Sequence, residues 1–468
     1  MQNRREFIKT LAVGAAGMAI LPQIAFGRTD VWSSVYQQIL SRIKPPVFRN
    51  RDFDITKFGA RSGIVNDSSA AISSAIDACS KSGGGRVIVP AGEFLTGAVH
   101  LRSNVNLHLV KDATLKFSTD PKKYPVVFTR WEGMECMNLS PFIYAFEQSN
   151  IAVTGEGTLD GQANNENWWL WQGSARYGWK EGMPNQRAAR AKLYAMMEKS
   201  VPVSDRVFGE ESFLRPNFIQ PYRCKNVLIE GVRIVNSPMW EIHPVLSENV
   251  TVRKVRISSH GPNNDGCDPE SCKDVLIEDC SFDTGDDCIA IKSGRNEDGR
   301  RIGVPTENVI IRGCEMKDGH GGVTVGSEIS GGVKNVFAEN CRMDSPNLDH
   351  ALRVKNNAAR GGLLEKFYFR NITVGQVAHA LITIDFNYEE GAKGNFTPVM
   401  REFVVDNLRS SKSKYGVDIQ GLSNAPVYDV TIANSAFENV SDGNIVKNLN
   451  GLKLDNVRVN GKVVTDLK

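Results

Sequence analysis

Acidic residues gather in one short part of the chain. Asp265 is followed 21 residues later by the adjacent pair Asp286 and Asp287. If that distance is one coil of a repeating fold, Asp265 lies above Asp286 at about the 4.8 Å spacing of neighbouring strands. Gly285 would supply a turn that lets both residues of the pair face outward. Carboxylates this close raise the pKa of at least one member, so that one stays protonated while its neighbours ionise. Glycosidic bond cleavage needs this combination of a general acid and a base or nucleophile.

Two further motifs follow at intervals of roughly one coil. His320 lies among the glycines of residues 319–322, and glycines let the backbone approach a ligand closely. Arg353 and Lys355 are two residues apart, so on a strand they point the same way. Two cations beside three acids suit the binding of a substrate that carries a carboxylate, which arginine can bind through two hydrogen bonds.

Other interpretations of these residues exist. Asn263, Asp265 and Asp286 could cap turns, and clustered oxygens also suit Ca²⁺. A lone histidine is most often structural, and a pair of cations often forms a solvated face. The order and register of the motifs nevertheless favour a catalytic site.

The body of the chain repeats one short pattern, in which a polar residue precedes alternating apolar and polar residues. Strong copies begin at Asn226, Asn249, Asp274, Asn308 and Asn335, with spacings of 23, 25, 34 and 27 residues. Each copy is typical of strand, bend and strand, and only stacked copies can bury its apolar face. We therefore predict an all-β fold, a single-stranded right-handed parallel β-helix, with the Asn and Asp residues stacked at one bend. A β-propeller fits less well because its blades need about 40–45 residues.

Three stretches interrupt this period. Residues 68–80 have the spacing of an amphipathic helix, through Ala71, Ile72, Ala75, Ile76 and Cys79. We expect this helix to cap the open N-terminal end of the solenoid. Residues 161–221 form a long insertion rich in tryptophan, and residues 295–301 lengthen one coil. Long insertions in a repeat map to loops and often bear function.

Composition limits the classes of protein. The 468 residues include 56 Lys+Arg and 53 Asp+Glu, a net charge of +3 that is too balanced for a dedicated nucleic-acid-binding protein. The nine cysteines are an odd number without a C-x-x-C pair, which predicts buried free thiols rather than disulfides or a zinc site.

The first 27 residues are typical of an export signal. Arg4 and Arg5 precede an apolar run over residues 11–21, and small residues follow. The adjacent arginines resemble a bacterial twin-arginine signal; an ordinary secretory signal or an uncleaved anchor is the alternative. We thus expect a signal at 1–27, a lead-in at 28–51 and a catalytic β-helix at 52–468, in the periplasm or secreted. No later segment reaches 18 uninterrupted apolar residues, so no membrane span is expected in the mature chain.

Four motifs in this order resemble those of the polygalacturonases of glycoside hydrolase family 28. They are Asn263-Asn264-Asp265, Asp286-Asp287, Gly319-His320-Gly321 and Arg353-Val354-Lys355, with a supporting run at 344–349. The resemblance extends over roughly residues 52–460. It implies a right-handed parallel β-helix that cleaves galacturonan-type pectin by inversion and needs no metal or cofactor.

The resemblance also implies a role for each matching residue. Asp286 corresponds to the general acid, Asp265 and Asp287 hold and activate the water, and His320 tunes the acid pair. The residues expected to bind the substrate are Asn263, Arg353, Lys355 and Tyr388. Two positions depart from the family pattern, since Asn264 stands where threonine is usual and His350 where relatives often carry arginine. The exact sugar therefore stays open.

The loop lengths predict the mode of attack. Loops at 161–221 and 295–301 could wall off one end of the groove, with tryptophan faces for sugar rings and Arg300 or Arg301 near a terminal carboxylate. This favours removal of sugars from the non-reducing end. The alternatives are a rhamnogalacturonan-type hydrolase, a calcium-dependent pectate lyase and a non-catalytic β-helix that binds polysaccharide. The expected partner is a pectic oligo- or polysaccharide, and the oligomeric state is open.

Overall fold

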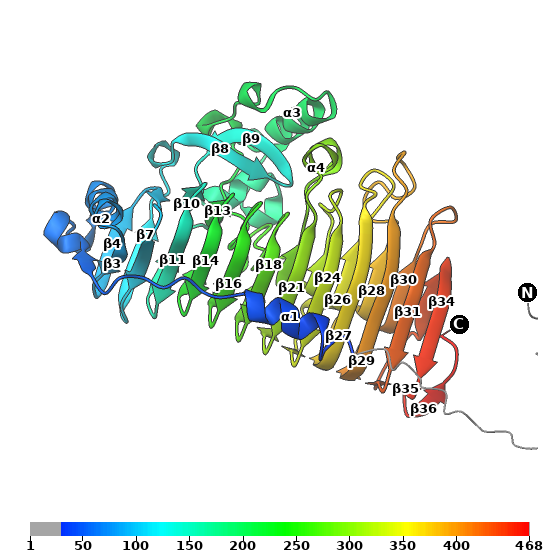
Figure 1. The fold of residues 1–468 in the computed structure, drawn as a ribbon. Helices are drawn as coiled ribbons and strands as arrows, with labels where there is room; N and C mark the ends of the chain where they lie inside the picture. The colour runs from blue at the N-terminus through cyan, green and yellow to red at the C-terminus, as the bar shows by residue number, and fades with distance from the viewer. Residues whose placement is uncertain (1–29, 468) are drawn as a thin grey trace, which may run out of the picture.

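The chain winds into a long solenoid of parallel strands in the computed structural model, which describes residues 30–467 (Figure 1). The expected export signal lies outside these residues. Strands from successive coils pair in parallel along nearly the whole length. The prediction of a parallel β-helix is therefore confirmed.

Each coil contributes a strand to up to three parallel ladders. The first ladder contains β1 (Asp52–Asp54), β3 (Gly85–Val89), β6 (Val105–Leu109), β11 (Ser149–Gly155), β14 (Lys225–Glu230), β16 (Glu248–Arg253), β18 (Lys273–Glu278), β21 (Thr306–Arg312), β24 (Val333–Glu339), β27 (Leu363–Gln376), β29 (Val399–Lys412), β31 (Val427–Ala433) and β34 (Leu449–Asp455). The second contains β2 (Gly63–Asp67), β4 (Gly92–Thr96), β7 (Ala113–Phe117), β12 (Thr158–Asp160), β15 (Arg233–Val235), β17 (Arg256–Ser259), β19 (Ser281–Thr284), β22 (Glu315–Met316) and β25 (Arg342–Met343), and after β27 and β29 it continues with β32 (Ala436–Phe437) and β35 (Val457–Val459).

The third ladder carries the candidate site. It contains β5 (Val99–His100), β10 (Ile143–Phe146), β13 (Ile219–Tyr222), β20 (Ile289–Ile291), β23 (Gly319–Val325), β26 (Leu348–Lys355), β28 (Ala380–Asp385), β30 (Tyr415–Gln420) and β33 (Asn444–Lys447). Single bridges through Ile242 and Cys267 connect β13 to β20. The coils between these two strands therefore keep the same register although their strands are very short.

The predicted repeats stack in the predicted register. Val227, Val250, Val275, Val309 and Val336 pair in turn across β14, β16, β18, β21 and β24, and all are buried. Each lies one residue after its polar bend residue. Stacking of identical inward positions gives one continuous apolar core, which no single coil could form.

The bend residues form a ladder of their own. Asn226 donates to Asn150 at 2.8 Å, and Asn249 donates to Asn226 at 2.8 Å. All three have φ between 54° and 56°, a left-handed conformation that Asn tolerates better than most residues. The prediction that Asn and Asp stack from coil to coil is confirmed.

Both ends of the solenoid are closed. Helix α2 (Ser69–Lys81) lies at the N-terminal end and buries the five apolar residues that defined its predicted face (Figure 1). Its bounds differ from the prediction by one residue at each end. At the other end β35 pairs antiparallel with β36 (Lys462–Val464), which ends the parallel ladder.

A helix that the sequence did not predict lies on the outside of the solenoid. Helix α1 (Val35–Arg42), within the lead-in at 28–51, packs across the first ladder. Its buried Tyr36 and Ile39 cover an outward-facing apolar row that includes Ile310 and Phe337.

Three excursions lie together along one edge of the solenoid in Figure 1. They are the hairpin of β8 (Val126–Trp131) and β9 (Met134–Leu139), helix α3 (Arg187–Glu198) and helix α4 (Asn296–Ile302). Trp131, Met134, Leu193, Met197 and Trp240 form a second small core beneath the hairpin and α3. The insertion is therefore packed against the solenoid as a rigid wall.

The cysteine prediction is confirmed, because all nine cysteines are free and buried. Among residues 30–467 no helix is long and apolar enough to cross a membrane.

Candidate active site

Three carboxylates meet at the start of the strands of the third ladder. Oxygen atoms of Asp265, Asp286 and Asp287 all lie within 4.8 Å of one another. The predicted convergence is therefore present, but its register differs by one residue. Cys267 pairs with Ile289, and the Gly266 amide donates to the Asp287 carbonyl at 3.0 Å, so Asp265 stacks beside Asp287 rather than beside Asp286.

The adjacent acids face different surroundings. The Asp286 side chain is 18% exposed, whereas Asp287 is fully buried. The expectation that both face outward is thus correct only for Asp286. Asp287 accepts hydrogen bonds from Thr324 Oγ1 at 3.0 Å and Lys355 Nζ at 2.6 Å. Burial alone would raise the pKa of Asp287, but Lys355 and Arg353 lower it below its ordinary value.

Asp286 is paired with the predicted histidine. Nδ1 of His320 lies 2.9 Å from Oδ1 of Asp286, which also accepts the Asp287 amide at 3.0 Å. Burial would raise the pKa of Asp286, but the hydrogen bond from His320 outweighs it and lowers that pKa. The same bond raises the pKa of His320 to about 9. At neutral pH the pair is an imidazolium and a carboxylate.

Asp265 has the opposite tendency. It is buried, and burial followed by repulsion from Asp286 raises its pKa well above the ordinary value. Lys292 Nζ, at 3.4 Å from Oδ2, opposes this rise. The trio therefore holds one proton most easily on Asp265 when no substrate is present.

The first motif is braced from below. Asn264 is buried and its side chain bonds Ser259, Gly261, Ser237 and Met239 at 2.7 to 3.1 Å. Asn264 therefore fixes the loop that presents Asp265. Asn263 accepts a hydrogen bond from Arg215 at 2.7 Å and lines the pocket described below.

The cations predicted to bind substrate are held by the site's own acids. Lys355 pairs with Asp287, and Arg353 Nη1 lies 3.6 Å from Asp287 Oδ1. The Lys355 ammonium lies 5.3 Å from the ring centroid of Tyr388. The structure thus brings Asp265, Asp286, Asp287, His320, Asn263, Arg353, Lys355 and Tyr388 to one place.

A pocket of about 430 Å³ opens beside Asp265 and Asp286. Its further lining residues come from separate segments: Glu132, Arg190, Trp240, Asn263, Lys292, Arg295, Ser327, Glu328, Lys355, Tyr388 and Glu389. The β8–β9 turn supplies Glu132 and α3 supplies Arg190. The insertion does wall one side of the site, as the loop lengths predict.

The residues expected to do so were partly wrong. Arg300 donates to the Ala359 carbonyl at 3.0 Å, and Arg301 pairs with Glu135 at 2.6 Å. Neither lines the pocket, because both serve to hold α4 in place. Arg295, at the start of that loop, lines it instead.

The tryptophans of the insertion are likewise structural. Trp168 is buried against Trp171 and Tyr124, and the indole N–H of Trp179 bonds the Met183 carbonyl at 2.9 Å. Trp240, which lies outside the insertion, supplies the aromatic face of the pocket.

Several site residues escaped the sequence analysis. Lys292, Arg295 and Glu328 stand in ordinary-looking repeats, and the β8–β9 hairpin has no strong motif. A signal for the hairpin was available, because Asn104 and Asn150 are 46 residues apart where other coils need 23 to 34. The arginine that braces Asn263, Arg215, makes its contacts across three coils, which no spacing rule foretells.

His350 is not a substrate residue. It is buried, its Nδ1 lies 2.7 Å from Thr383 Oγ1, and its ring packs against His379. Burial and the nearby Arg353 lower its pKa to about 2, so the ring is neutral.

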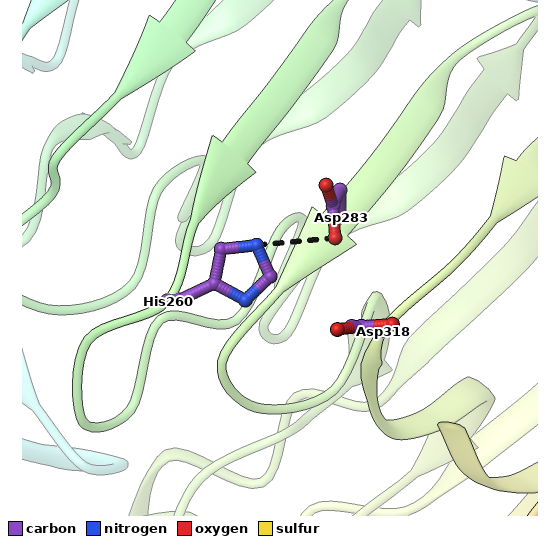
Figure 2. A group of neighbouring side chains, drawn as sticks. All are labelled: His260, Asp283 and Asp318. Carbon is purple, nitrogen blue, oxygen red and sulfur yellow. Dashed lines mark ion pairs between the residues drawn. The ribbon is translucent and has the colours of Figure 1, made fainter. Parts of the chain in front are cut away.

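A wider hollow lies on the other side of His320. It has an empty volume of about 910 Å³ and is lined by residues that include Arg176, Asp318 and Asn347. At its edge, His260 Nε2 lies 3.1 Å from Asp283 Oδ1, with Asp318 beside them (Figure 2). Two hollows thus flank the Asp286–His320 pair.

Two groups within residues 30–467 have the spacing for a metal ion: the catalytic trio, and His260 with Asp283 and Asp318. The trio already has Lys292, Lys355 and His320 as counter-charges. Calcium prefers six to eight oxygen ligands, and neither group offers such a set. The donor chemistry therefore does not favour the calcium-dependent lyase.

Paired carboxylates with different proton affinities, placed at a pocket in a parallel β-helix, define a glycoside hydrolase site. The model of "Glycosyl hydrolases family 28" matches residues 209–458. This chain belongs to that family, and it is a glycoside hydrolase.

Relatives with named activities cover most of the chain. A crystal structure of a hyperthermoactive exopolygalacturonase from Thermotoga maritima is 47% identical, covers 92% of this chain and 97% of its own, and has a TM-score of 0.90. An exo-poly-alpha-D-galacturonosidase of Dickeya chrysanthemi is 26% identical over 88% of this chain and 75% of its own length. The predicted family resemblance is confirmed.

Proposed function

We propose that this enzyme hydrolyses galacturonic-acid-containing pectin from the non-reducing end of oligogalacturonides. The observation that carries the proposal is the Asp286–His320 pair, which faces Asp265 at the mouth of a walled pocket. The names of the Thermotoga and Dickeya relatives support the same substrate class and the same mode of attack.

The acids divide the reaction between them. Asp286, in its protonated form, gives its proton to the glycosidic oxygen as the bond between that oxygen and the anomeric carbon breaks. A water held at Asp265 and Asp287 attacks the anomeric carbon and passes a proton to Asp265. One water is consumed, the leaving sugar gains a hydroxyl, and the cleaved sugar gains a new anomeric hydroxyl.

The free site favours another proton arrangement, with the proton on Asp265 and Asp286 ionised beside His320. Substrate binding must therefore move the proton to Asp286, and contact with the glycosidic oxygen supplies the reason. Asp265 and Asp286 are within 4.8 Å, so the trio titrates as a unit rather than as separate acids.

Stereochemistry needs a separate argument. The carboxylate oxygens are within 4.8 Å, whereas inverting glycosidases usually separate their two carboxyl groups by about 6.5–9.5 Å. The distance alone would favour retention. Asp287 is tied to Lys355 and Asp265 to Lys292, however, and a carboxylate paired with an ammonium is a poor nucleophile. We therefore propose inversion, which proton NMR of the first-formed anomer tests.

The charge of the pocket suits an acidic sugar. Arg190, Lys292, Arg295 and Lys355 line it together with Tyr388. Acids accompany these cations, so a sugar carboxylate competes with protein carboxylates for them. This competition selects a ligand that brings its own negative charge to the arginine or lysine groups.

Export remains a proposal from the sequence of residues 1–27. The Arg4-Arg5 pair supports a twin-arginine route to the periplasm. Replacing both arginines with lysine should leave the protein in the cytoplasmic fraction, and unchanged export would contradict the route.

One experiment tests the function. Purified enzyme is incubated with galacturonide oligomers labelled at the reducing end, with rhamnogalacturonan oligomers as the comparison. We expect unlabelled mono- or disaccharide from galacturonides only. Preferential cleavage of rhamnogalacturonan would establish the alternative substrate, and an unsaturated product absorbing in the ultraviolet would establish a lyase.

A further inference from the structure

Each of the two water-holding carboxylates has its own lysine. Lys355 Nζ lies 2.6 Å from Asp287 Oδ2, and Lys292 Nζ lies 3.4 Å from Asp265 Oδ2. The pairing of β20, β23 and β26 places Lys292, Gly326 and Lys355 in one column of the ladder. The two ammonium groups therefore lie on either side of a residue without a side chain.

Gly326 is required between them. Its φ is 111°, and a Cβ there would meet the Lys355 carbonyl oxygen at 2.3 Å. The space that glycine leaves lets both lysines reach inward to their carboxylates.

The Lys292 ammonium is fixed in place. It lies 3.3 Å from Glu328 Oε2 and 4.3 Å from the ring centroid of Trp240, and its side chain is only 3% exposed. Glu328 in turn pairs with Arg295. A chain of contacts thus runs from the pocket wall to Asp265.

The surroundings of Asp265 make this contact important. The charged and titratable groups that act on Asp265 or lie against its near neighbours are Glu241, Asp268, Asp286, Asp287, Lys292, His320 and Lys355. Four of these seven are acids. Among the described residues, Lys292 is the single ion-pair partner of Asp265, whose Oδ1 has no hydrogen-bond partner.

Neighbouring acids show what happens without such a partner. Glu241 and Asp268 are buried, their carboxylate oxygens have no hydrogen-bond partner, and burial raises the pKa of both well above the ordinary value. Burial and Asp286 act on Asp265 in the same direction. Without Lys292 it would join them as a permanently neutral acid, unable to accept a proton from water.

We propose that Lys292 is a positioning residue that holds Asp265 in the ionised form required of a general base. It acts through Asp265 and not on the sugar. The inference rests on the proposed hydrolysis, in which Asp265 takes the proton of the attacking water.

The pH dependence of kcat/KM tests this role. An opposite charge within about 4–6 Å lowers a carboxyl pKa by roughly 1–3 units. Lys292→Met should therefore move the acidic limb of the profile to higher pH by about one unit or more. Lys292→Arg keeps the charge and should restore the limb close to its wild-type position.

A matched variant should act in the other direction. Glu328→Gln removes the acid that shares Lys292 and leaves the ammonium to Asp265 alone. We expect the acidic limb to stay in place or move to lower pH. An upward shift in Glu328→Gln equal to that in Lys292→Met would indicate general disturbance of the pocket and overturn the proposal.

The split between kinetic constants separates positioning from substrate contact. We expect kcat in Lys292→Met to fall at acidic pH and recover as the pH rises, with KM changed by less than about threefold, because uniform binding is not lost. A large rise in KM with an unmoved acidic limb would make Lys292 a substrate-binding residue. A pH-independent fall in kcat would make it merely structural.

A second measurement does not need the reaction. Apparent melting temperatures of wild type, Lys292→Met, Asp265→Asn and the double variant form a cycle. We expect the two substitutions to be coupled at pH 7 and the coupling to vanish in acid, where Asp265 is protonated. Independent effects at every pH overturn the proposal even if galacturonide hydrolysis is confirmed, whereas coupling without hydrolysis of any galacturonide contradicts only the proposed function.

Discussion

His320 Nδ1 and Asp286 Oδ1 are 2.9 Å apart, and each shifts the pKa of the other. The hydrogen bond raises the pKa of His320 to about 9 and lowers that of Asp286. The ion pair therefore exists at neutral pH, fails in acid when Asp286 is protonated, and fails in alkali when His320 loses its proton.

Replacing His320 should change both activity and stability with pH. In His320→Ala the pKa of Asp286 rises, so the protonation that limits activity in acid or supplies the general acid moves to higher pH. The raised pKa of His320 means that its stabilising effect is full below about pH 6.5, the ordinary pKa, and disappears as the pH rises through about 9. Melting temperatures of wild type and variant should differ at pH 6 and converge at pH 10. A difference that is constant over this range would contradict an ionic role.

The general acid assignment predicts a large kinetic effect. Asp286→Asn should lower kcat by about 10³-fold or more, because general acid catalysis contributes roughly 10²–10⁴-fold. The fold should persist, since the asparagine oxygen can still accept from His320 and from the Asp287 amide. Steady-state kinetics and circular dichroism check the two parts. Near-normal turnover would remove Asp286 from the mechanism.

The sequence predicted much of this molecule because a solenoid repeats its rules. Asn226 and Asn249 marked both the strand positions and the bend, since each coil must meet the same steric and hydrogen-bonding demands. The catalytic residues Asp286 and His320 followed from register in the same way. A spacing of 21 residues nevertheless placed Asp265 beside the wrong member of the pair, because the short strands around Cys267 leave the register to single bridges.

The pocket wall could not be predicted by the same reasoning. Its residues come from a hairpin, a helix and two loops, and their contacts depend on how separate excursions pack together. Arg295 and Arg301 look alike in the sequence, but only Arg295 lines the pocket, while Arg301 pairs with Glu135. Helix α1 was missed because eight residues with a narrow apolar face become helical only when Tyr36 and Ile39 find the row they cover.

Lys355 should contribute to more than substrate affinity. Its ammonium is 2.6 Å from the fully buried Asp287, and breaking a buried ion pair by removing one partner costs about 3–5 kcal/mol. We expect Lys355→Met to lower the melting temperature and kcat as well as raise KM for galacturonides. Adding Asp287→Asn removes the stranded charge and should recover part of the stability but none of the activity. An effect confined to KM would mean that Lys355 serves the substrate alone.

Helix α1 should stabilise the solenoid from outside. Ile39 is 1% exposed and packs on the apolar row of the first ladder, and Ile→Ala at such a site costs about 2–5 kcal/mol. Ile39→Ala should therefore lower the melting temperature without changing KM, because the helix lies outside the active site. Gln37→Ala, at an exposed position of the same helix, is the control and should have little effect. Equal stability of the two variants would show that α1 does not contribute to folding.

The walled pocket predicts how a polymer is degraded. An enzyme that cuts internally needs a groove open at both ends, but here Glu132, Arg190, Arg295 and Glu389 stand across one side of the pocket. Glu132 pairs with Arg190 at 2.8 Å, and the small core of Trp131 and Met134 holds this wall rigidly. On polygalacturonate we expect reducing ends to accumulate steadily while viscosity stays nearly constant. A rapid fall in viscosity at low conversion, with mixed oligomers as early products, would show that the chain passes the wall and that the enzyme cuts internally.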